Sequence, residues 1–505
     1  MGGRLSWLVA VLVGLSGCQV DGDAPLRREA SEREATELAQ TAPAPRSGLG
    51  LPPMTREELM DPETCGSCHP THFREWEMSM HAYAANDPVF IAMNKRGQRE
   101  TNGALGDFCV NCHAPMAVRE GLTKDGLNLA ELPQKMKGVT CYFCHNAVEV
   151  GPDHFNNPIK LANDTIMRGP IRDPVNPGVH GVAYDEAFND NSLKSNVMCG
   201  SCHDIVNAKG AHIERTFKEY KESFFNRPRD QSGDTCAGCH MPVRENAFVT
   251  IIPNEQLPKR NLHVHSWPGV DVALSDWPHD EEFRRLTDCV LSMSVTVYAV
   301  RSDGRGGFTV MLETQAGHKQ PSGASADRRM WLEFVAYNAQ NQVVFKTGVI
   351  ADGEREEYPP GDPKHDPRLF MLRDRWKDDA GEETHMFWEV APNGISDLSL
   401  PPMSVPGVPH YLERTFQIPT RQQPARVEMR VKMRPVGIDV LEDLVASGDL
   451  DPAVIDRMPT FTLKATELVW TPAMGLDWKP KMRRPAYCFK DDVPIDPATG
   501  APAAP

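Results

Sequence analysis

Five copies of one cysteine–histidine motif lie within a single stretch of this 505-residue chain. Each copy reads Cys-x-x-Cys-His, and the copies are Cys65-Cys68-His69, Cys109-Cys112-His113, Cys141-Cys144-His145, Cys199-Cys202-His203 and Cys236-Cys239-His240. This is the attachment signature of c-type haem, in which two thiols form thioethers to the porphyrin and the adjacent histidine binds the iron. Zinc or disulfide use of paired cysteines does not explain why a histidine follows every pair. The sequence therefore predicts five covalently bound haems, with the motif histidines as proximal iron ligands.

The motifs crowd into a region that is too short for five haems and a conventional apolar core. All five lie between Cys65 and His240, and many Pro, Asn and Gly residues occur between residues 151 and 200. Such residues favour loops. We therefore expect a pentahaem domain at residues 61–284, mostly helical and loop, with porphyrins as its core and a short helix at each motif.

Short apolar runs with alternating polarity begin beyond about residue 287. They cover residues 293–300, 308–312, 331–337, 343–345, 427–433 and 461–470, and turn sequences such as Ser302-Asp303-Gly304 separate several of them. This pattern predicts a β-sandwich at residues 285–475, with a less regular insertion at 353–410 and an extended tail at 476–505. The expected fold class is multidomain α+β.

The N-terminus has the pattern of a bacterial export signal. Arg4 precedes an apolar run that ends in Leu15-Ser16-Gly17-Cys18, which resembles a lipobox. The run is far shorter than the roughly 20 residues of a spanning helix, so we expect a signal peptide at residues 1–18 and lipidation of Cys18 rather than a transmembrane anchor. Residues 19–60 show no sustained apolar period and are expected to form a disordered tether. The expected location is the bacterial envelope, with Gln19 favouring the outer membrane, facing the periplasm or the cell surface.

The chain carries a formal net charge of −15 before haem propionates are added. This charge argues against nucleic acid as a partner. Two readings stay open: a basic redox partner docks on the acidic surface, or the acidity keeps an exported protein soluble.

The chemistry of the irons depends on their sixth ligands. A second histidine gives an electron carrier, whereas an open position lets a substrate bind the iron. Twelve histidines remain after the five motif histidines are assigned, and eight of them, His212 included, lie in the expected haem domain. His212 is one distal candidate.

The haem region resembles the multihaem cytochromes related to hydroxylamine oxidoreductase and its tetrahaem acceptor cytochrome. The segments that carry the resemblance are Trp76-x-x-Ser79-x-His81-Ala82, Gly178-Val179-His180-Gly181, Arg215-Thr216-Phe217-Lys218-Glu219-Tyr220, Thr235-Cys236-Ala237-Gly238-Cys239-His240-Met241-Pro242 and Arg260-x-x-His263-x-His265-x-x-x-Gly269-Val270-Asp271. The resemblance covers residues 61 to about 280 and implies closely stacked haems with mostly bis-histidine ligation. It implies distal roles for His81, His180 and His265, with His263 as the alternative to His265.

The chain also departs from the enzymes of that group. All five motifs end in histidine, whereas a pentahaem nitrite reductase would carry a lysine in one of them. We therefore expect an electron relay between exported partners, either cytochromes or membrane quinol-oxidising complexes, and assign no catalytic residue. The alternative is an oxidoreductase acting on a small nitrogen or sulfur species at one five-coordinate haem, because only three or four distal histidines have convincing contexts.

Two cysteines remain, Cys289 and Cys488, near the two ends of the expected β-domain. A disulfide between them is expected because the exported compartment is oxidising. Two separate thiols are the alternative, since sequence gives no distance.

His318 lies in the segment Ala316-Gly317-His318-Lys319-Gln320-Pro321-Ser322-Gly323. Gly and Pro on both sides favour a tight loop around a single imidazole. The segment resembles the Gly-His-x-x-Pro-Thr-Gly loop of β-domains appended to multihaem cytochromes. We expect this loop to reach back to a haem and supply a distal ligand; the alternative is a histidine that only hydrogen-bonds within its loop.

Overall fold

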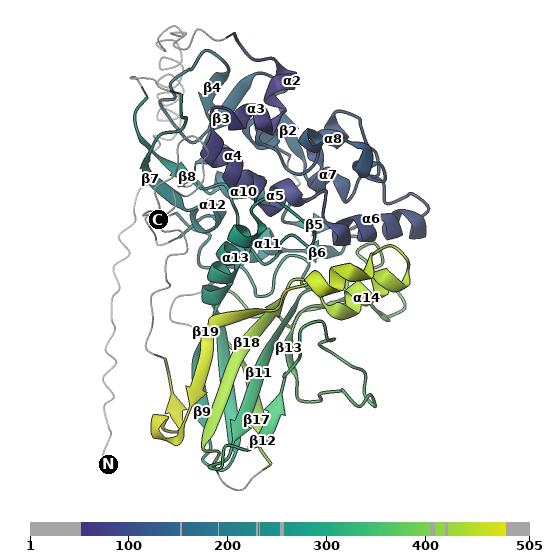
Figure 1. The fold of residues 1–505 in the computed structure, drawn as a ribbon, viewed down its shortest axis with the longest axis vertical. Coiled ribbons are helices and arrows are strands. Elements are labelled where there is room, and N and C mark those ends of the chain that lie inside the picture. The colour runs from purple at the N-terminus through teal and green to yellow at the C-terminus, as the bar shows by residue number, and fades with distance from the viewer. Residues whose placement is uncertain are drawn as a thin grey trace, which may run out of the picture.

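The computed structural model describes residues 52–151, 154–189, 191–228, 231, 233–252, 257–404, 410–419 and 423–480. It contains a haem-motif region of short helices and loops (residues 52–279) and, below it in Figure 1, a β region of long strands (residues 295–480). The expected signal peptide, Cys18 and Cys488 lie outside the described residues, so the predictions about them stay predictions. Among the described helices, none combines the length and the apolarity needed to cross a membrane.

Short helices joined by loops build the haem-motif region. Its α-helices are α2 (Arg56–Leu59), α3 (Pro62–Gly66), α4 (Pro70–Glu77), α5 (Met80–Tyr83), α6 (Pro88–Glu100), α7 (Val110–His113), α8 (Pro115–Arg119), α9 (Cys141–His145), α10 (Lys194–Gly200), α11 (Thr216–Glu222) and α12 (Cys236–His240). Short 3₁₀ turns are η1 (Leu129–Glu131), η2 (Gln134–Met136) and η3 (Glu186–Phe188). Every motif overlaps one of the short α-helices, as the sequence predicts.

The local sequence explains why two of the motif helices begin where they do. Thr140 and Thr235 immediately precede the first cysteine of their motifs, and their side chains accept hydrogen bonds from the backbone N–H groups of Phe143 and Gly238. A threonine in this position satisfies an N–H group that a helix start otherwise leaves without a partner. The cap therefore fixes the orientation of the cysteine that follows it.

Two-stranded pairs complete the haem-motif region. They are β1 (Ala147–Val150) with β2 (Ile159–Leu161), β3 (Ile166–Gly169) with β4 (Gly181–Tyr184), β5 (Ile205–Val206) with β6 (His212–Glu214), and β7 (Val243–Ala247) with β8 (Arg260–His263). Only the β3–β4 pair is parallel within this set.

The expected tether extends too far toward the folded part of the chain. Thr55 and Glu58 form a capping box at α2, and the backbone N–H of Met54 donates to the carbonyl of Val179 over 2.8 Å. Leu59 and Met60 are buried. Residues 52–60 are therefore part of the fold, because a capped turn brings two apolar side chains into the core at the end of a polar segment.

The two regions are joined by the longest helix of the described chain, α13 (Asp280–Ser294). The predicted boundary between residues 284 and 285 falls inside this helix. Phe283 and Leu291 on α13 are buried and belong to the same apolar cluster as the strands that follow. The boundary prediction is therefore wrong in detail, because one helix packs on the β region while it leaves the haem-motif region.

Two antiparallel sheets form the β region (Figure 1). One has the order β17 (Leu412–Gln417), β10 (Gly307–Thr314), β9 (Val295–Ser302), β20 (Asp477–Trp478), and the other β12 (Val343–Thr347), β11 (Arg329–Tyr337), β18 (Arg426–Arg434), β19 (Phe461–Trp470), with β13 (Phe370–Leu372) also paired to β11. Five of the six predicted apolar runs lie entirely in strands of these sheets, and the sixth, 293–300, does so from Val295 onward, because residues 293–294 end α13. Within the expected extended tail, β20 pairs with β9, and residues 481–505 lie outside the described residues.

Smaller elements decorate the β region. They are β14 (Arg375–Lys377) between β15 (Glu383–Thr384) and β16 (Ile395–Ser396), helix α14 (Ile438–Ala446), and the 3₁₀ turns η5 (Pro452–Arg457) and η6 (Pro472–Met474). The apolar face of α14 meets that of α6 in a shared cluster, so this helix ties the β region to the haem-motif region.

The two sheets share one apolar core. Ring centroids of Phe334 on β11 and Phe416 on β17 lie 4.8 Å apart, as do those of Phe308 on β10 and Trp470 on β19. These contacts cross from one sheet to the other, because β17 and β10 belong to the first sheet and β11 and β19 to the second. Alternation along the strands places their apolar side chains on the facing surfaces.

Candidate haem-binding site

A cavity of about 1530 Å³ occupies the centre of the haem-motif region. All fifteen cysteines and histidines of the five motifs line it, and so do His72, His81, His180, His263, His265 and His318. The β region closes part of the wall with its His318 loop and with Asp327 and Arg328. We number the motifs 1 to 5 in chain order.

Each motif histidine has its Nδ1 atom bound to an acceptor of the protein. The Nδ1–acceptor distances are 2.6 Å for His69 to Val249 O, 2.9 Å for His113 to Ala84 O, 2.5 Å for His145 to Arg168 O, 3.1 Å for His203 to Glu214 Oε1 and 3.1 Å for His240 to Pro268 O. Such a bond fixes the proton on Nδ1 and leaves Nε2 as the metal-binding nitrogen. All five rings are therefore arranged as iron ligands.

Four motif histidines face a second histidine at a nearly constant separation. The ring centroids are 6.4 Å apart for His69 and His180, 6.2 Å for His145 and His265, 6.4 Å for His203 and His81, and 6.3 Å for His240 and His318. A metal–imidazole bond of about 2.0–2.1 Å, with about 1.1 Å from nitrogen to ring centre, puts two trans imidazoles about 6.3 Å apart, centre to centre. The described residues therefore fit an iron between the rings of each pair.

The second histidines carry the features of neutral ligands. His180, His265 and His318 each have Nδ1 bound to a backbone carbonyl, of Gly181, His263 and Lys319, at 2.8–3.0 Å. Burial lowers the pKa of His81 and of His265 to about 3 and that of His318 to about 4. Because neutral imidazole is the form that binds metal, these rings need no deprotonation to act as ligands.

Three other histidines are placed differently. His263 lines the cavity and its Nδ1 is bound to Met241 O at 2.6 Å, as in the proposed ligands, but the ring that faces His145 is that of His265, two residues further along the chain. His212 does not line the cavity and lies 3.5 Å from Asp204. His72 was not singled out by sequence reasoning. Its ring centroid lies 4.9 Å from that of His265 and 6.3 Å from that of His69, and its ring plane is almost perpendicular to that of His69. His69 caps the start of α4 and His72 follows three residues later, so both side chains project from the same side of the helix.

Motif 2 differs from the other four. The ring of His113 is stacked on Phe90 of α6, with centroids 3.9 Å apart and planes 3° from parallel. All 17 histidines of the chain lie among the described residues, and none of the described ring pairs joins His113 to a second histidine. An iron held by His113 therefore lacks a histidine on its other side.

The motifs lie close to one another. Helix α3 of motif 1 contacts α9 of motif 3, and α10 of motif 4 contacts α12 of motif 5. Asn157 donates to Asn111 O in motif 2 and to Ser201 O in motif 4, and Cys144 of motif 3 packs on the same apolar cluster as Met198, which directly precedes motif 4. Motif 1 therefore lies beside motif 3, and motif 4 is a junction that adjoins motifs 2, 3 and 5.

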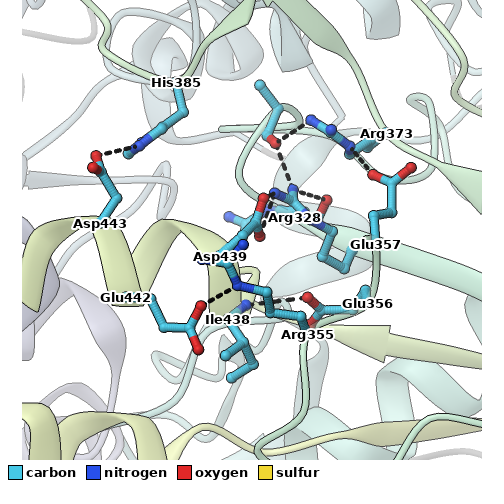
Figure 2. Close-up of polar contacts among 12 residues, drawn as sticks. Arg328, Arg355, Glu356, Glu357, Arg373, His385, Ile438, Asp439, Glu442 and Asp443 are labelled. Carbon is cyan, nitrogen blue, oxygen red and sulfur yellow. Dashed lines mark hydrogen bonds and ion pairs between the residues drawn. The ribbon is translucent and has the colours of Figure 1, made fainter. Parts of the chain in front are cut away.

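A polar network in the β region supports the cavity wall (Figure 2). Arg328 donates to both carboxylate oxygens of Asp271 at 2.7 and 2.8 Å, which ties the two regions together. In Figure 2, Asp443 points to His385 and Glu356 points to the backbone N–H of Ile438, with distances of 2.8 and 3.1 Å. The backbone N–H of Gly437 donates to Asp327 O at 2.7 Å and Arg328 donates to Pro435 O at 3.2 Å, so contacts from both regions hold the segment that carries Asp327 and Arg328.

Cys289 is disulfide-bonded, and none of the ten motif cysteines takes part in a disulfide, so all ten are available for haem attachment. Cys488 lies outside the described residues, so its pairing with Cys289 stays a prediction.

Besides His72, sequence reasoning missed two residues of the site. Phe90 lies 23 residues before His113, and Glu214 lies 11 residues after His203, on the strand that pairs with β5. The Asp87-Pro88 start of α6 is a visible helix signal, but no local pattern reveals that its Phe90 meets His113. Glu214 is one carboxylate among many and carries no signal at all.

Comparison with known proteins agrees with this geometry. The family model described as cytochrome c554 and c-prime matches residues 64–146, which contain motifs 1 to 3. The solved structure of a penta-heme cytochrome c552 from Thermochromatium tepidum aligns with a TM-score of 0.55 and 19% identity, over 81% of this chain and 98% of that chain. At this identity the likeness concerns the fold. No curated protein matches the chain. The family match and the fold support a multihaem c-type cytochrome with covalently bound haem.

Proposed function

We propose that this chain binds five c-type haems and relays single electrons between redox partners in the bacterial envelope. The observation that carries the proposal is the set of four histidine pairs with centroid separations of 6.2–6.4 Å. A haem iron held by two histidines keeps its ligands in both oxidation states, so little rearrangement opposes electron transfer. The proposed distal ligands are His180, His265, His81 and His318 for motifs 1, 3, 4 and 5.

The order of the motifs in space supports a continuous relay. In support of this, the contacts described above join motif 1 to motif 3 and motif 4 to motifs 2, 3 and 5. An electron can therefore travel from the haem of motif 1 through that of motif 3 to that of motif 4. From this junction it can continue to the haem of motif 2 or to that of motif 5. The two sheets with their shared core form, in this proposal, a β-sandwich domain that contributes His318 to one end.

The surroundings of His113 support a second candidate function, located at motif 2. Its iron would have an open position, which is where an oxidoreductase binds a small nitrogen or sulfur species. The relay would then deliver electrons to, or collect them from, that iron. The observation behind this candidate is the absence of a partner histidine for His113 among all 17 histidines, each of which is described.

Three measurements on the purified holoprotein test both candidates. Intact mass should show five haem additions, electron paramagnetic resonance should show four low-spin haems and one high-spin haem, and carbon monoxide should bind about one haem per chain. Fewer than five haems after full maturation, or several carbon monoxide sites in the unmodified protein, would overturn the relay. Five haems without any carbon monoxide site would leave the relay and eliminate the oxidoreductase candidate.

The location and partners are part of the same proposal. Lipidation at Cys18 would hold the protein at the envelope, and the partners would be cytochromes or quinol-oxidising complexes of the membrane. The lipobox-like sequence and the haem motifs support this placement.

A further inference from the structure

The five motif histidines do not all have the same kind of hydrogen-bond acceptor. His69, His113, His145 and His240 donate from Nδ1 to backbone carbonyl oxygens. His203 alone meets a side chain, the carboxylate of Glu214, at 3.1 Å. The chain therefore contains four internal references against which this one site can be compared.

The fold positions Glu214 for this contact. The motif-4 histidine is followed at once by β5, and β6 returns antiparallel to it with Glu214 opposite Ile205. Glu214 lines the cavity, and its side chain is only 22% exposed. Within the described residues, the ion pairs of Glu214 include no arginine or lysine, because the nearby Arg328 is bound to Asp271. The carboxylate is therefore hydrogen-bonded to the imidazole of His203, while its charge also acts on Arg328 and on His113 of motif 2.

A carboxylate draws the Nδ1 proton more strongly than an amide carbonyl does. The hydrogen bond is charge-assisted, and it makes the ring a more basic ligand through Nε2. A more basic ligand stabilises ferric iron more than ferrous iron, and the second shell is one of the means by which a protein sets a haem potential. The negative charge of Glu214 acts in the same direction.

We propose that Glu214 is a positioning residue that gives the haem of motif 4 the lowest reduction potential in the array. This inference rests on the proposed relay and adds an energy profile to it. An electron arriving at motif 4 reduces its iron from ferric to ferrous. On leaving, it restores the ferric state there and produces one ferrous iron at motif 2, 3 or 5, with no bond or proton exchanged. Because motif 4 is the junction, its low potential keeps electrons on the surrounding haems.

The test is a potentiometric titration of the five haems in holoprotein carrying Glu214→Gln. The glutamine oxygen is a neutral acceptor of the same size, so it turns this site into the carbonyl type of the other four. We expect one couple to move upward by at least a tenfold change in its reduction equilibrium, which is 59 mV for one electron, together with a change in the g values of one low-spin signal. The couples of motifs 1, 3 and 5 should stay in place, and the motif-2 couple should move less than the motif-4 couple, because Glu214 acts on His113 by its charge alone.

One variant assigns the couple to motif 4, a second tests the role of the charge, and a third is a control at a distant carboxylate. His81→Met replaces the second histidine of motif 4, and Met/His ligation raises a haem potential, so the couple it moves belongs to motif 4. Glu214→Asp keeps the charge and should retain a couple closer to wild type than Glu214→Gln does. Glu245→Gln removes an exposed carboxylate on β7 and should leave all five couples unchanged.

The outcomes separate this inference from the relay itself. Suppose that the wild-type protein binds five haems. The role of Glu214 is then overturned if Glu214→Gln moves no couple, moves all five equally, or moves most strongly a couple other than the one marked by His81→Met. If Glu214→Gln fails to bind five haems, the wild-type and Glu214→Asp proteins are compared instead. The role of Glu214 is then overturned if the motif-4 couple is not the lowest of the five in these two proteins. A wild-type protein with fewer than five haems would instead overturn the relay.

Discussion

Replacing His318 with alanine should open a second iron in the array. His318 faces His240 with ring centroids 6.3 Å apart and planes 16° from parallel, and its Nδ1 is held by Lys319 O at 2.9 Å. The histidine therefore bonds within its loop and also faces a motif histidine. Four histidine pairs and one unpaired motif histidine predict one carbon monoxide site per wild-type chain. His318→Ala leaves three pairs, so the number should rise from about one to about two, and one low-spin haem should become high-spin.

The assay is a carbon monoxide difference titration with haem content measured on the same sample. His365→Ala is the matched control, because His365 also lies in the β region but its Nδ1 binds Tyr358 O and its ring does not line the cavity. The control should keep one site. If His318→Ala binds five haems and still shows the wild-type carbon monoxide stoichiometry and spin states, His318 is not an iron ligand.

Three further predictions concern other parts of the chain. Cys18→Ser should move the protein from the membrane fraction to the soluble fraction, and unchanged retention would count against lipidation. Arg434→Met should lower the free energy of unfolding by about 3–5 kcal/mol in a denaturant titration, because it leaves the fully buried Glu356 without its partner; adding Glu356→Leu should recover part of the loss. Burial raises the pKa of Asp87 from 3.8 to about 7, so the folded state holds this proton more tightly, and the free energy of unfolding should fall as pH rises from about 4 to 7. Asp87→Asn should flatten that dependence, and an equal slope in both proteins would refute it.

Sequence alone predicted the parts of the site that depend on local spacing. The motif helices follow from Cys-x-x-Cys-His, and the His318 loop was found through its Gly and Pro neighbours. The pairing of His180 with His69, or of His81 with His203, was not predictable, because each pair joins segments far apart in the chain. The contact of Glu214 with His203 was not predictable either, since only the pairing of two strands brings the two residues together.

The fold was predicted best where alternation is regular. The apolar runs of β9, β10, β11, β12, β18 and β19 all proved to be strands. The strand β17 was missed because its alternating polar residues include only Leu412 and Phe416 as large apolar side chains. Helix α14 was also missed, although its buried Ile438, Leu441 and Leu444 follow the helical period.

The central cavity has a consequence for how this protein must be made. Many of the side chains that line it are apolar, such as Leu59, Phe90 and Phe143. Five haems, as proposed, would cover these side chains and so supply much of the apolar burial that stabilises this region. Under that proposal, haem attachment would accompany folding, and chains that fail to acquire haem would remain open polypeptides that proteases can cut.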